Sequence, residues 1–257
     1  MKGMIATLRL PGTVAYLDGV RLMEDLVRRR IADGTRPNIL LLLEHAPVYT
    51  AGRRLKGAQL EAEQRAVYAK TGIALVATGR GGQTTYHGPG QLVGYPVADL
   101  RTLAPAPGER LGVRGFVAAL EAAVMAACLT LGVATTRTGD TGVWAAADAS
   151  RKVAALGVQV SRYVASHGFA LNCDVDLRAF DHIVPCGLAD KHATSLTNER
   201  LLSNRIISPV TVDDAVPAVI TAFADCFNAD MPLLHDVNPV VESEIFAFLA
   251  KTKGGAN

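Results

Sequence analysis

A glycine-rich segment at residues 79–90 constrains the fold more than any other part of this sequence. It reads Gly-Arg-Gly-Gly-Gln-Thr-Thr-Tyr-His-Gly-Pro-Gly and lies between two apolar, β-type runs at 73–77 and 91–97. Five glycines in twelve residues allow the backbone to adopt positive φ angles and to pass close to a ligand. A plain hairpin needs only about two to five turn residues. We therefore interpret the segment as the wall of a small-ligand pocket; the alternative is a long surface loop.

Apolar periodicity along the rest of the chain predicts strands interleaved with helices. Pro11 and Gly12 are expected to end the first strand, with Thr13 as the N-cap of the first helix, and residues 187–207 are expected to be irregular. Several consecutive strands among the helices predict an α+β fold with a mixed β-sheet flanked by helices. The predicted strands, besides the two runs above, lie at 5–10, 39–43, 134–137, 141–145, 153–160 and 164–173, and the predicted helices at 14–33, 60–70, 113–131, 212–227 and 240–249.

Length and composition narrow the class of protein. A chain of 257 residues allows one large domain or two modest ones, and the best internal break, at 105–108, is too short to link independent domains. With 49% apolar and 19% charged residues the composition is that of an ordinary soluble protein. A net charge of +2 does not by itself indicate a nucleic-acid partner. No apolar run approaches the ~20 residues that span a bilayer, and the N-terminus lacks a signal-peptide pattern, so we expect a cytoplasmic protein.

Two basic clusters and four cysteines add further expectations. The clusters at 28–30 and 53–56 are interpreted as solvated faces, with a docking patch for an acidic partner as the alternative. The cysteines at 128, 173, 186 and 226 are too scattered for a disulfide framework. Cys128, Cys173 and Cys226 are expected to be small, inert residues of apolar surroundings.

Cys186 and Lys152 are the residues with the most reactive chemistry. Cys186 lies between a proline and a glycine, which favours an exposed bend where a thiolate is accessible, although an inert thiol is the open alternative. Lys152 begins an apolar run; it is either a solvated strand end or, if turned towards a thiol, a cation that favours the thiolate and later acts as a base.

Other common catalytic patterns receive less support. His87 and His167 lie in polar turns and are interpreted as structural. His182, Cys186 and His192 do not have zinc-ligand spacing, so no metal is predicted. The chain contains no G-x-S-x-G elbow, and the glycine-rich segment is neither a dinucleotide fingerprint nor a Walker loop.

Five motifs in order resemble those of the lipoyl(octanoyl) transferases. They are the glycine-rich segment extended to residue 91, Leu-Leu-Leu-Glu-His-Ala-Pro-Val-Tyr-Thr at 41–50, Lys-Val-Ala-Ala-Leu-Gly at 152–157, His-Gly-Phe-Ala-Leu-Asn at 167–172 and Pro-Cys-Gly at 185–187. The resemblance covers residues 5–228, so a single catalytic domain over 1–257 with a helical tail at 229–257 is expected. The glycine-rich segment alone is less specific, because lipoate and biotin ligases carry a similar one.

The resemblance implies an acyltransferase of lipoic acid biosynthesis, an octanoyl-[acyl-carrier-protein]:protein N-octanoyltransferase. Such an enzyme moves an octanoyl or lipoyl group from acyl carrier protein to a lysine of lipoyl domains, those of 2-oxoacid dehydrogenase E2 subunits and glycine cleavage H protein. It needs no cofactor, no nucleic acid and no membrane. The implied fold is that of the biotin/lipoate protein ligase catalytic domain.

The resemblance also implies roles for individual residues. Cys186 would be the acyl-thioester nucleophile, and Lys152 would lower the pKa of its thiol. Two readings from other classes stay open: an ATP-dependent lipoate or biotin ligase, which would not need Cys186, and a non-catalytic module that binds acyl carriers. The implied substrate-binding residues are Arg80, Gly81, Gly82, Gln83, Thr84, Thr85, Tyr86, His87, Ala155, Leu156, Gly157, Gly168, Phe169 and Ala170.

Overall fold

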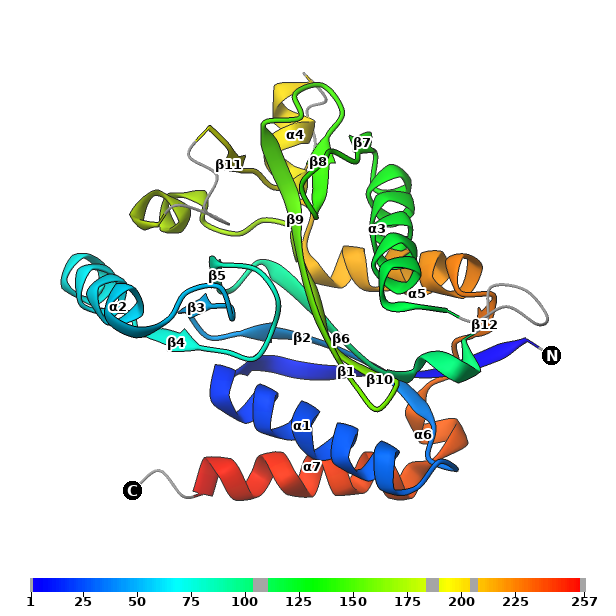
Figure 1. The fold of residues 1–257 in the computed structure, drawn as a ribbon. Coiled ribbons are helices and arrows are strands. Elements are labelled where there is room, and N and C mark those ends of the chain that lie inside the picture. Colours follow the sequence, from blue (N-terminus) through cyan, green and yellow to red (C-terminus); the bar gives the residue numbers. More distant parts are fainter. Residues whose placement is uncertain (1, 104–110, 184–189, 204–207, 255–257) are drawn as a thin grey trace.

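A long mixed β-sheet forms the centre of the computed structural model, which describes residues 2–103, 111–183, 190–203 and 208–254 (Figure 1). Its strand order is β12-β1-β2-β6-β10-β9-β8-β7, with β11 pairing with β9. β12, β1 and β2 run parallel to one another, whereas β2, β6, β10, β9, β8 and β7 pair antiparallel in turn. The strands are β1 (Gly3–Val14), β2 (Asn38–His45), β6 (Gln91–Asp99), β7 (Thr135–Thr136), β8 (Val143–Ala145), β9 (Arg151–Ser161), β10 (Val164–Asn172), β11 (His192–Ala193) and β12 (Ala229–Asp230). The mixed sheet expected from the sequence is confirmed.

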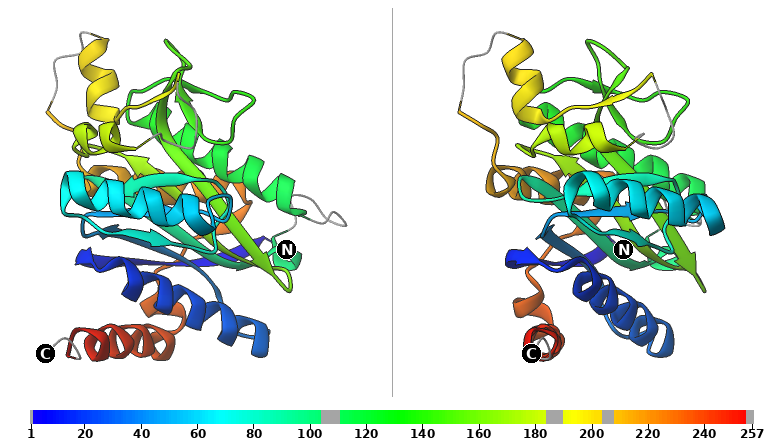
Figure 2. Two further views of the ribbon diagram at one scale, coloured as in Figure 1. Left: turned by 60° about the vertical axis from the view of Figure 1, so that its left-hand side comes forward. Right: turned by 90° about the vertical axis from the view of Figure 1, so that its left-hand side faces the viewer.

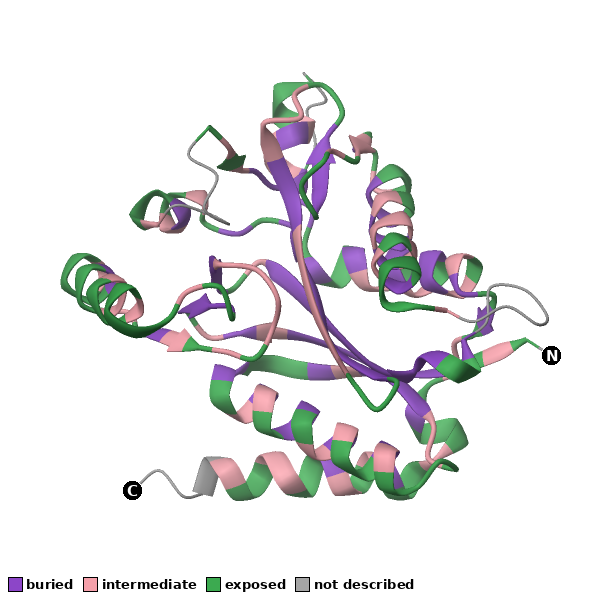
Figure 3. Cartoon of the chain, in the orientation of Figure 1, coloured by how far each residue is buried: buried purple, intermediate pink, exposed green. Residues whose placement is uncertain are grey.

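Helices cover both faces of this sheet (Figures 1 and 2). α1 (Tyr16–Ala32) and α7 (Pro239–Gly254) lie on one side, and α3 (Val113–Thr130) and α5 (Val212–Cys226) on the other. The continuous apolar run of β2 follows from this layering, because Leu41 and Leu43 pack on the α1 side while Leu40 and Leu42 pack against α3 and α5. Figure 3 shows the central strands buried and the outer helices buried on one face only.

A smaller sheet lies beside the main one and carries the glycine-rich segment. Its order is β4-β3-β5, with β4 (Leu75–Ala77) parallel and β5 (Thr84–His87) antiparallel to β3 (Val48–Ala51). α2 (Gly57–Thr71) packs against it through Val67 and ends at Gly72, whose left-handed φ of 68° closes the helix. The remaining short helices are α4 (Leu196–Leu202), α6 (Leu234–Val237) and the 3-10 turns Leu100–Thr102 and Leu177–His182.

Three local predictions are wrong. Pro11 and Gly12 do not end the first strand, since β1 continues to Val14 with a register shift between Arg9 and Thr13. The helix then begins after Ala15, so Thr13 is not its N-cap. Residues 187–207 are not wholly irregular either: within them lie β11 and α4, and the Ser195 side chain caps α4 by accepting a hydrogen bond from the Asn198 amide.

The basic cluster at 28–30 is engaged within the protein. Arg28 and Arg29 both pair with Asp25 on α1, and Arg30 is buried with its guanidinium 3.7 Å from the Asp99 carboxylate. Arg30 therefore departs from the solvated face that the sequence predicted.

The chain beyond the motif-bearing region packs onto the same body. β12 extends the main sheet beside β1, and α7 lies along α1 with Val241 and Ile245 in the shared apolar cluster. Glu244 of α7 forms ion pairs with Arg29 and Arg36.

Among the described residues, one helix has the length and composition of a membrane span. This is α3, with a mean hydropathy of 1.6 over 18 residues. Its length is close to the ~20 residues that span a bilayer, whereas the sequence was expected to contain no such run. Phe116, Leu120 and Val124 of α3 are buried in the main core, where the helix packs on α5 and the sheet. The core helix of a globular fold passes the same test, so α3 is explained by its packing.

Candidate active site

The glycine-rich segment is wedged between the small sheet and β9. A Cβ atom on Gly52 would lie 2.3 Å from the Gly82 carbonyl oxygen, and one on Gly157 would lie 2.9 Å from that of Gly81. Both distances are shorter than real Cβ contacts, so only glycine permits this approach of backbone to backbone. The amides of Arg53 and Arg54 donate to the carbonyls of Arg80 and Gly82, which ties the basic segment at 53–56 to this wall.

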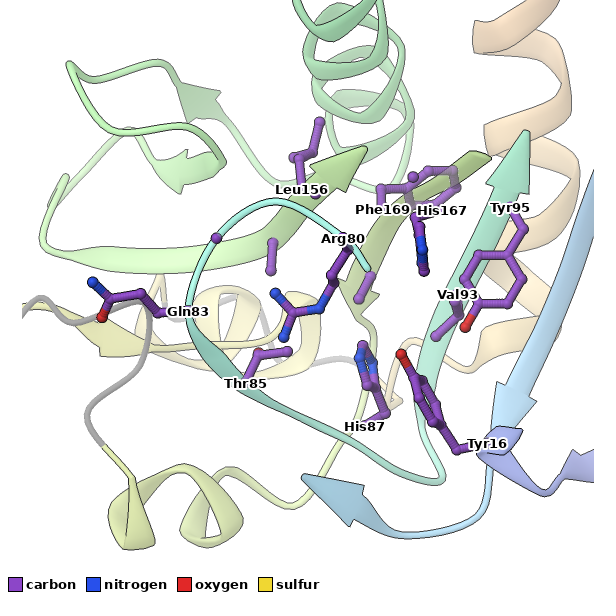
Figure 4. Close-up of a pocket in the computed structure, with 15 residues that line it drawn as sticks. Tyr16, Arg80, Gln83, Thr85, His87, Val93, Tyr95, Leu156, His167 and Phe169 are labelled. Atoms are coloured by element: carbon purple, nitrogen blue, oxygen red, sulfur yellow. The ribbon is translucent and has the colours of Figure 1, made fainter. Parts of the chain in front are cut away.

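A cavity opens between this wall, β6, β9 and β10 (Figure 4). In Figure 4, Tyr16, His87, His167 and Tyr95 gather on one side of Arg80, and Gln83 lies on the other. Val93, Leu156 and Phe169 supply apolar surface. The lining residues are Tyr16, Arg80, Gly82, Gln83, Thr85, His87, Val93, Tyr95, Ala155, Leu156, Gly157, His167, Gly168, Phe169 and Ala170.

Arg80 is held across the small sheet. Its Nη2 donates to both the carbonyl and the hydroxyl oxygen of Thr50, at 2.8 and 2.7 Å, and its Nη1 donates to the Gly81 carbonyl at 3.1 Å. The guanidinium is therefore a fixed cation in the wall of the cavity.

The three histidines of this region are buried and neutral. Burial lowers the pKa of His45 and of His167 to about 4, and lowers that of His87 well below its ordinary value. His45 Nδ1 donates to the Val14 carbonyl, so its Nε2 accepts the hydrogen bond from the Tyr95 hydroxyl at 2.7 Å. With these imidazoles neutral, Arg80 is the one formal charge among the described residues that line the cavity.

His167 adopts a backbone conformation that is rare for a residue other than glycine. Its φ is 57°, and its amide donates to the Met23 sulfur at 3.0 Å. The next residue, Gly168, has φ 149°, and a Cβ there would lie 2.3 Å from the Gly94 carbonyl oxygen. This bend directs the side chain of His167 into the cavity, and such strain is concentrated at functional sites.

A second cavity adjoins the first and contains Lys152. The two cavities share Thr85 and Ala155 as lining residues. Lys152 is 9% exposed, its Nζ donates to the Thr141 carbonyl at 3.3 Å, and it lies 4.4 Å from the ring centroid of Trp144. Lys191 approaches the same ring at 5.2 Å. The lysine is therefore turned inward and is not a solvated strand end.

The structure brings most of the sequence-predicted binding residues together. Eleven of the fourteen line the first cavity, and Gly81, Thr84 and Tyr86 do not. Tyr86 points away because β5 is a strand, in which alternate side chains face opposite sides; its ring packs on Tyr49 and Phe180.

Sequence reasoning missed Tyr16, Val93 and Tyr95, and interpreted His167 only as structural. Tyr16 is the first residue of α1, with no motif to mark it. The i, i+2 spacing of Val93 and Tyr95 on β6 was the available signal.

Cys186 lies outside the described residues. The chain is described up to Ile183 on one side and from Asp190 on the other. Phe180, before the gap, and Lys191, after it, both line the cavity that contains Lys152. Cys128 and Cys173 are fully buried, and burial raises the pKa of both thiols, that of Cys173 to about 12, in keeping with their predicted inertness. Cys226 is partly buried, and burial likewise raises its thiol pKa.

The architecture defines a class. The chain superposes on lipoate-protein ligase A bound with ATP with a TM-score of 0.66, covering 91% of this chain and 88% of that one at 16% identity. It superposes on an archaeal bipartite lipoate protein ligase from Thermoplasma acidophilum with a TM-score of 0.59, covering 91% and 86%, also at 16% identity. The fold is therefore that of the lipoate protein ligases.

Sequence comparison identifies the family within this class. Residues 15–224 match the lipoyl protein ligase A/B catalytic domain. The chain is 45% identical to the octanoyltransferase of Mycolicibacterium paratuberculosis over 226 residues, which cover 86% of this chain and 87% of the relative. It is 41% identical to that of Koribacter versatilis over 239 residues, which cover 93% and 90%. The chain belongs to the lipoyl protein ligase A/B catalytic domain family, and the resemblance found in the sequence is confirmed.

The buried histidines predict how stability depends on pH. Since the pKa of His167 is about 4 in the folded protein and about 6.5 in the unfolded chain, the unfolded state gains protons first as the pH falls. The free energy of unfolding is therefore not reduced by His167 above about pH 6.5. It falls as the pH is lowered from about 6.5 to about 4, by up to ~1.4 kcal/mol per pH unit. His167→Asn, which tolerates the left-handed backbone, should give a shallower dependence in urea unfolding between about pH 7 and 4.5. An unchanged slope would show that His167 is not held neutral.

Proposed function

We propose that this protein is an octanoyltransferase: it accepts an octanoyl group from acyl carrier protein onto Cys186 and passes it to the lysine of a lipoyl domain. The observation that carries the proposal is the junction of the two cavities at Thr85 and Ala155, with an apolar slot on one side and Lys152 on the other. The relatives that are 41–45% identical over most of the chain are octanoyltransferases, which supports this assignment.

The reaction divides into two acyl transfers. The Cys186 thiolate attacks the donor thioester; a new C–S bond forms to Cys186, the bond to the donor sulfur breaks, and that sulfur leaves as a thiolate that takes up a proton. The amine of the acceptor lysine then attacks the enzyme thioester, forming the amide C–N bond and releasing the Cys186 thiolate. The ammonium of Lys152 favours the Cys186 thiolate and gives its proton to the leaving donor thiolate. The neutral amine that results then removes the proton that the acceptor nitrogen must lose.

The energetics need no activation by ATP. Exchange between two thioesters is close to isoenergetic, and the final amide is the more stable product. The first cavity supplies binding energy for the octanoyl group, at roughly 0.8 kcal/mol for each CH₂ that it buries. Its apolar part, formed by Val93, Leu156 and Phe169 together with small residues, suits a straight saturated chain.

Acceptors, compartment and domain organisation follow from the same proposal. The acceptors would be the lipoyl domains of 2-oxoacid dehydrogenase E2 subunits and glycine cleavage H protein, and the site of action the cytoplasm. The 257 residues would act as one catalytic domain; in its support, β12 and α7, which belong to the tail after residue 228, pack on β1 and α1.

The main alternative is an ATP-dependent lipoate ligase. The likeness to lipoate ligases at 16% identity concerns the fold alone, and an adenylating enzyme would not need Cys186. Incubation of the protein with octanoyl-acyl carrier protein and a lipoyl domain in the absence of ATP separates the two, because only thioester transfer proceeds without a nucleotide. Tight binding of the octanoyl carrier with no covalent octanoyl adduct would instead indicate a non-catalytic module.

Cys186→Ser tests the covalent intermediate. Wild-type protein incubated with octanoyl-acyl carrier protein should gain the mass of one octanoyl group, and the variant should lose both this adduct and transfer to the lipoyl domain. Cys173→Ser is the matched control, because that thiol is buried and protonated, and it should keep both activities. Transfer by Cys186→Ser at the wild-type rate would contradict the mechanism.

Substitution of Lys152 separates its two roles. Lys152→Ala removes the cation, so the alkylation of Cys186 by iodoacetamide should shift to higher pH and acyl-enzyme formation should slow at neutral pH. Lys152→Arg keeps the charge and should restore much of the alkylation, yet fail in the second transfer because arginine does not release its proton. An alkylation profile that does not move in Lys152→Ala would refute the electrostatic role, and full turnover by Lys152→Arg would refute the base.

The basic segment at 53–56 is a candidate docking surface for an acidic carrier domain. Arg53, Arg54 and Lys56 are exposed, and the backbone amides of the two arginines bind the cavity wall. Arg53→Gln with Arg54→Gln should raise KM for the carrier protein and weaken the dependence of kcat/KM on salt. Arg21→Gln with Arg28→Gln, which removes the same charge from exposed positions of α1, is the control. Equal salt profiles for the two double variants would exclude this surface.

A further inference from the structure

A series of hydrogen bonds connects the first cavity, which we call the acyl cavity because it is proposed to hold the octanoyl group, to β9, the strand that carries Lys152. Arg80 donates to the Thr50 hydroxyl, which lies 3.3 Å from His87 Nε2. His87 Nδ1 lies 2.7 Å from Gln91 Oε1. Gln91 Nε2 donates to Asn172 Oδ1 at 2.8 Å, and Asn172 Nδ2 donates to the Thr194 carbonyl at 2.8 Å.

This series of hydrogen bonds ends at β9, next to Lys152. The Thr194 amide donates to the Lys152 carbonyl at 2.9 Å, directly after β11, which pairs with β9 at Arg151 and Lys152. The Thr194 hydroxyl donates to Glu199, whose carboxylate receives two hydrogen bonds from Arg151 at 2.7 and 2.9 Å. Thr194 therefore fixes the segment at 190–194 against β9, the strand that carries Lys152.

Donor and acceptor can be assigned in each of the hydrogen bonds that His87, Gln91 and Asn172 form in this series. Both protons of the Gln91 amide are used, since Nε2 also donates to the Tyr86 carbonyl at 3.1 Å. Gln91 Oε1 must then accept from His87 Nδ1–H, and the bare His87 Nε2 accepts from Thr50. Reversing the amide of Asn172 would place its oxygen against the Thr194 carbonyl, so that orientation is excluded. The lowered pKa of His87 agrees with the neutral imidazole that this order requires.

We propose that Gln91 and Asn172 are positioning residues that couple the acyl cavity to Lys152. Both are buried and both line the cavity of Lys152. Gln91 fixes the end of the glycine-rich segment through His87 and Tyr86, and Asn172 fixes the segment at 190–194 through Thr194. Gln91 and Asn172 are opposite each other in the pairing of β6 with β10, and their side chains extend this pairing to the glycine-rich segment on one side and to Thr194 on the other. This inference rests on the proposed function for the identity of the reacting thiol.

Asn172→Ala removes the link, and Asn38→Ala is its matched control. Asn38 is also buried, and its amide donates to a backbone carbonyl, that of Met4, in a part of the main sheet that contacts neither cavity. Both variants should lose stability, because each leaves buried polar groups unpaired. Only Asn172→Ala should lower kcat for octanoyl transfer, by roughly 10- to 100-fold, with a smaller change in KM, and shift the pH profile of Cys186 alkylation.

Gln91→Met provides a second variant of similar length. Its thioether cannot donate to Asn172, and it should reproduce the kcat loss of Asn172→Ala. If it lowers kcat while the Gln91→Met/Asn172→Ala double variant loses no more than either single one, the two residues act as one unit. Asn172→Ala with the kcat and alkylation profile of Asn38→Ala would overturn the proposal, as would wild-type kcat in Gln91→Met. Absence of octanoyl transfer in the wild-type protein would instead refute the proposed function, and the alkylation profiles would still test the coupling.

Discussion

The site depends on two contacts of backbone with backbone. The glycine-rich segment passes between Gly52 of the small sheet and Gly157 of β9 at distances that exclude a Cβ atom. Because the opposing atoms are carbonyls of the segment itself, no rotation of a side chain would relieve the clash. The segment is therefore held against both sheets at once, at the adjacent residues Gly81 and Gly82, and this fixes the wall of the cavity there. Arg80 extends this wall by bonding Thr50 across the small sheet.

The sequence predicts the architecture well where packing and periodicity agree. The apolar run of β2 is continuous because both of its faces are covered, and α3 is a helix whose apolar face meets α5 and the sheet. Prediction fails where tertiary pairing overrides a local signal. Pro11 and Gly12 are turn residues, yet the register shift between Arg9 and Thr13 absorbs them as an irregularity, and β1 resumes its pairing with β2. α4 was missed because its seven residues are too few to show a helical period.

In the candidate site, too, residues marked by local sequence signals were predicted and residues placed by tertiary structure were missed. Motifs identified the wall residues of the cavity, because glycines and polar groups in an apolar context are visible in a sequence. Thr84 and Tyr86 were predicted as binding residues only because they lie within the motif. Since alternate side chains of β5 face opposite sides, they point away from the cavity that Thr85 and His87 line. Tyr16 carries no motif, and the i, i+2 spacing of Val93 and Tyr95 shows only that they share one face of a strand, so the topology is needed to place all three at the cavity. The Gln91–Asn172 link belongs to this group too, since its partners are 81 positions apart.

Charge is distributed in a way that suits a two-cavity mechanism. In the first cavity, burial keeps His87 and His167 neutral, so changes near neutral pH do not place new charge beside a bound apolar chain. In the second, the ammonium groups of Lys152 and Lys191 lie 4.4 and 5.2 Å from the centroid of the Trp144 ring, whose face attracts cations. Under the proposed mechanism, a thiolate at the second cavity would meet these cations, whereas the acyl chain of the thioester would extend past Thr85 and Ala155 into the first cavity, where Arg80 is the one charge among the described lining residues. The thioester carbonyl would then lie at the junction, between the cations of the second cavity and the apolar surface that Val93, Leu156 and Phe169 give to the first.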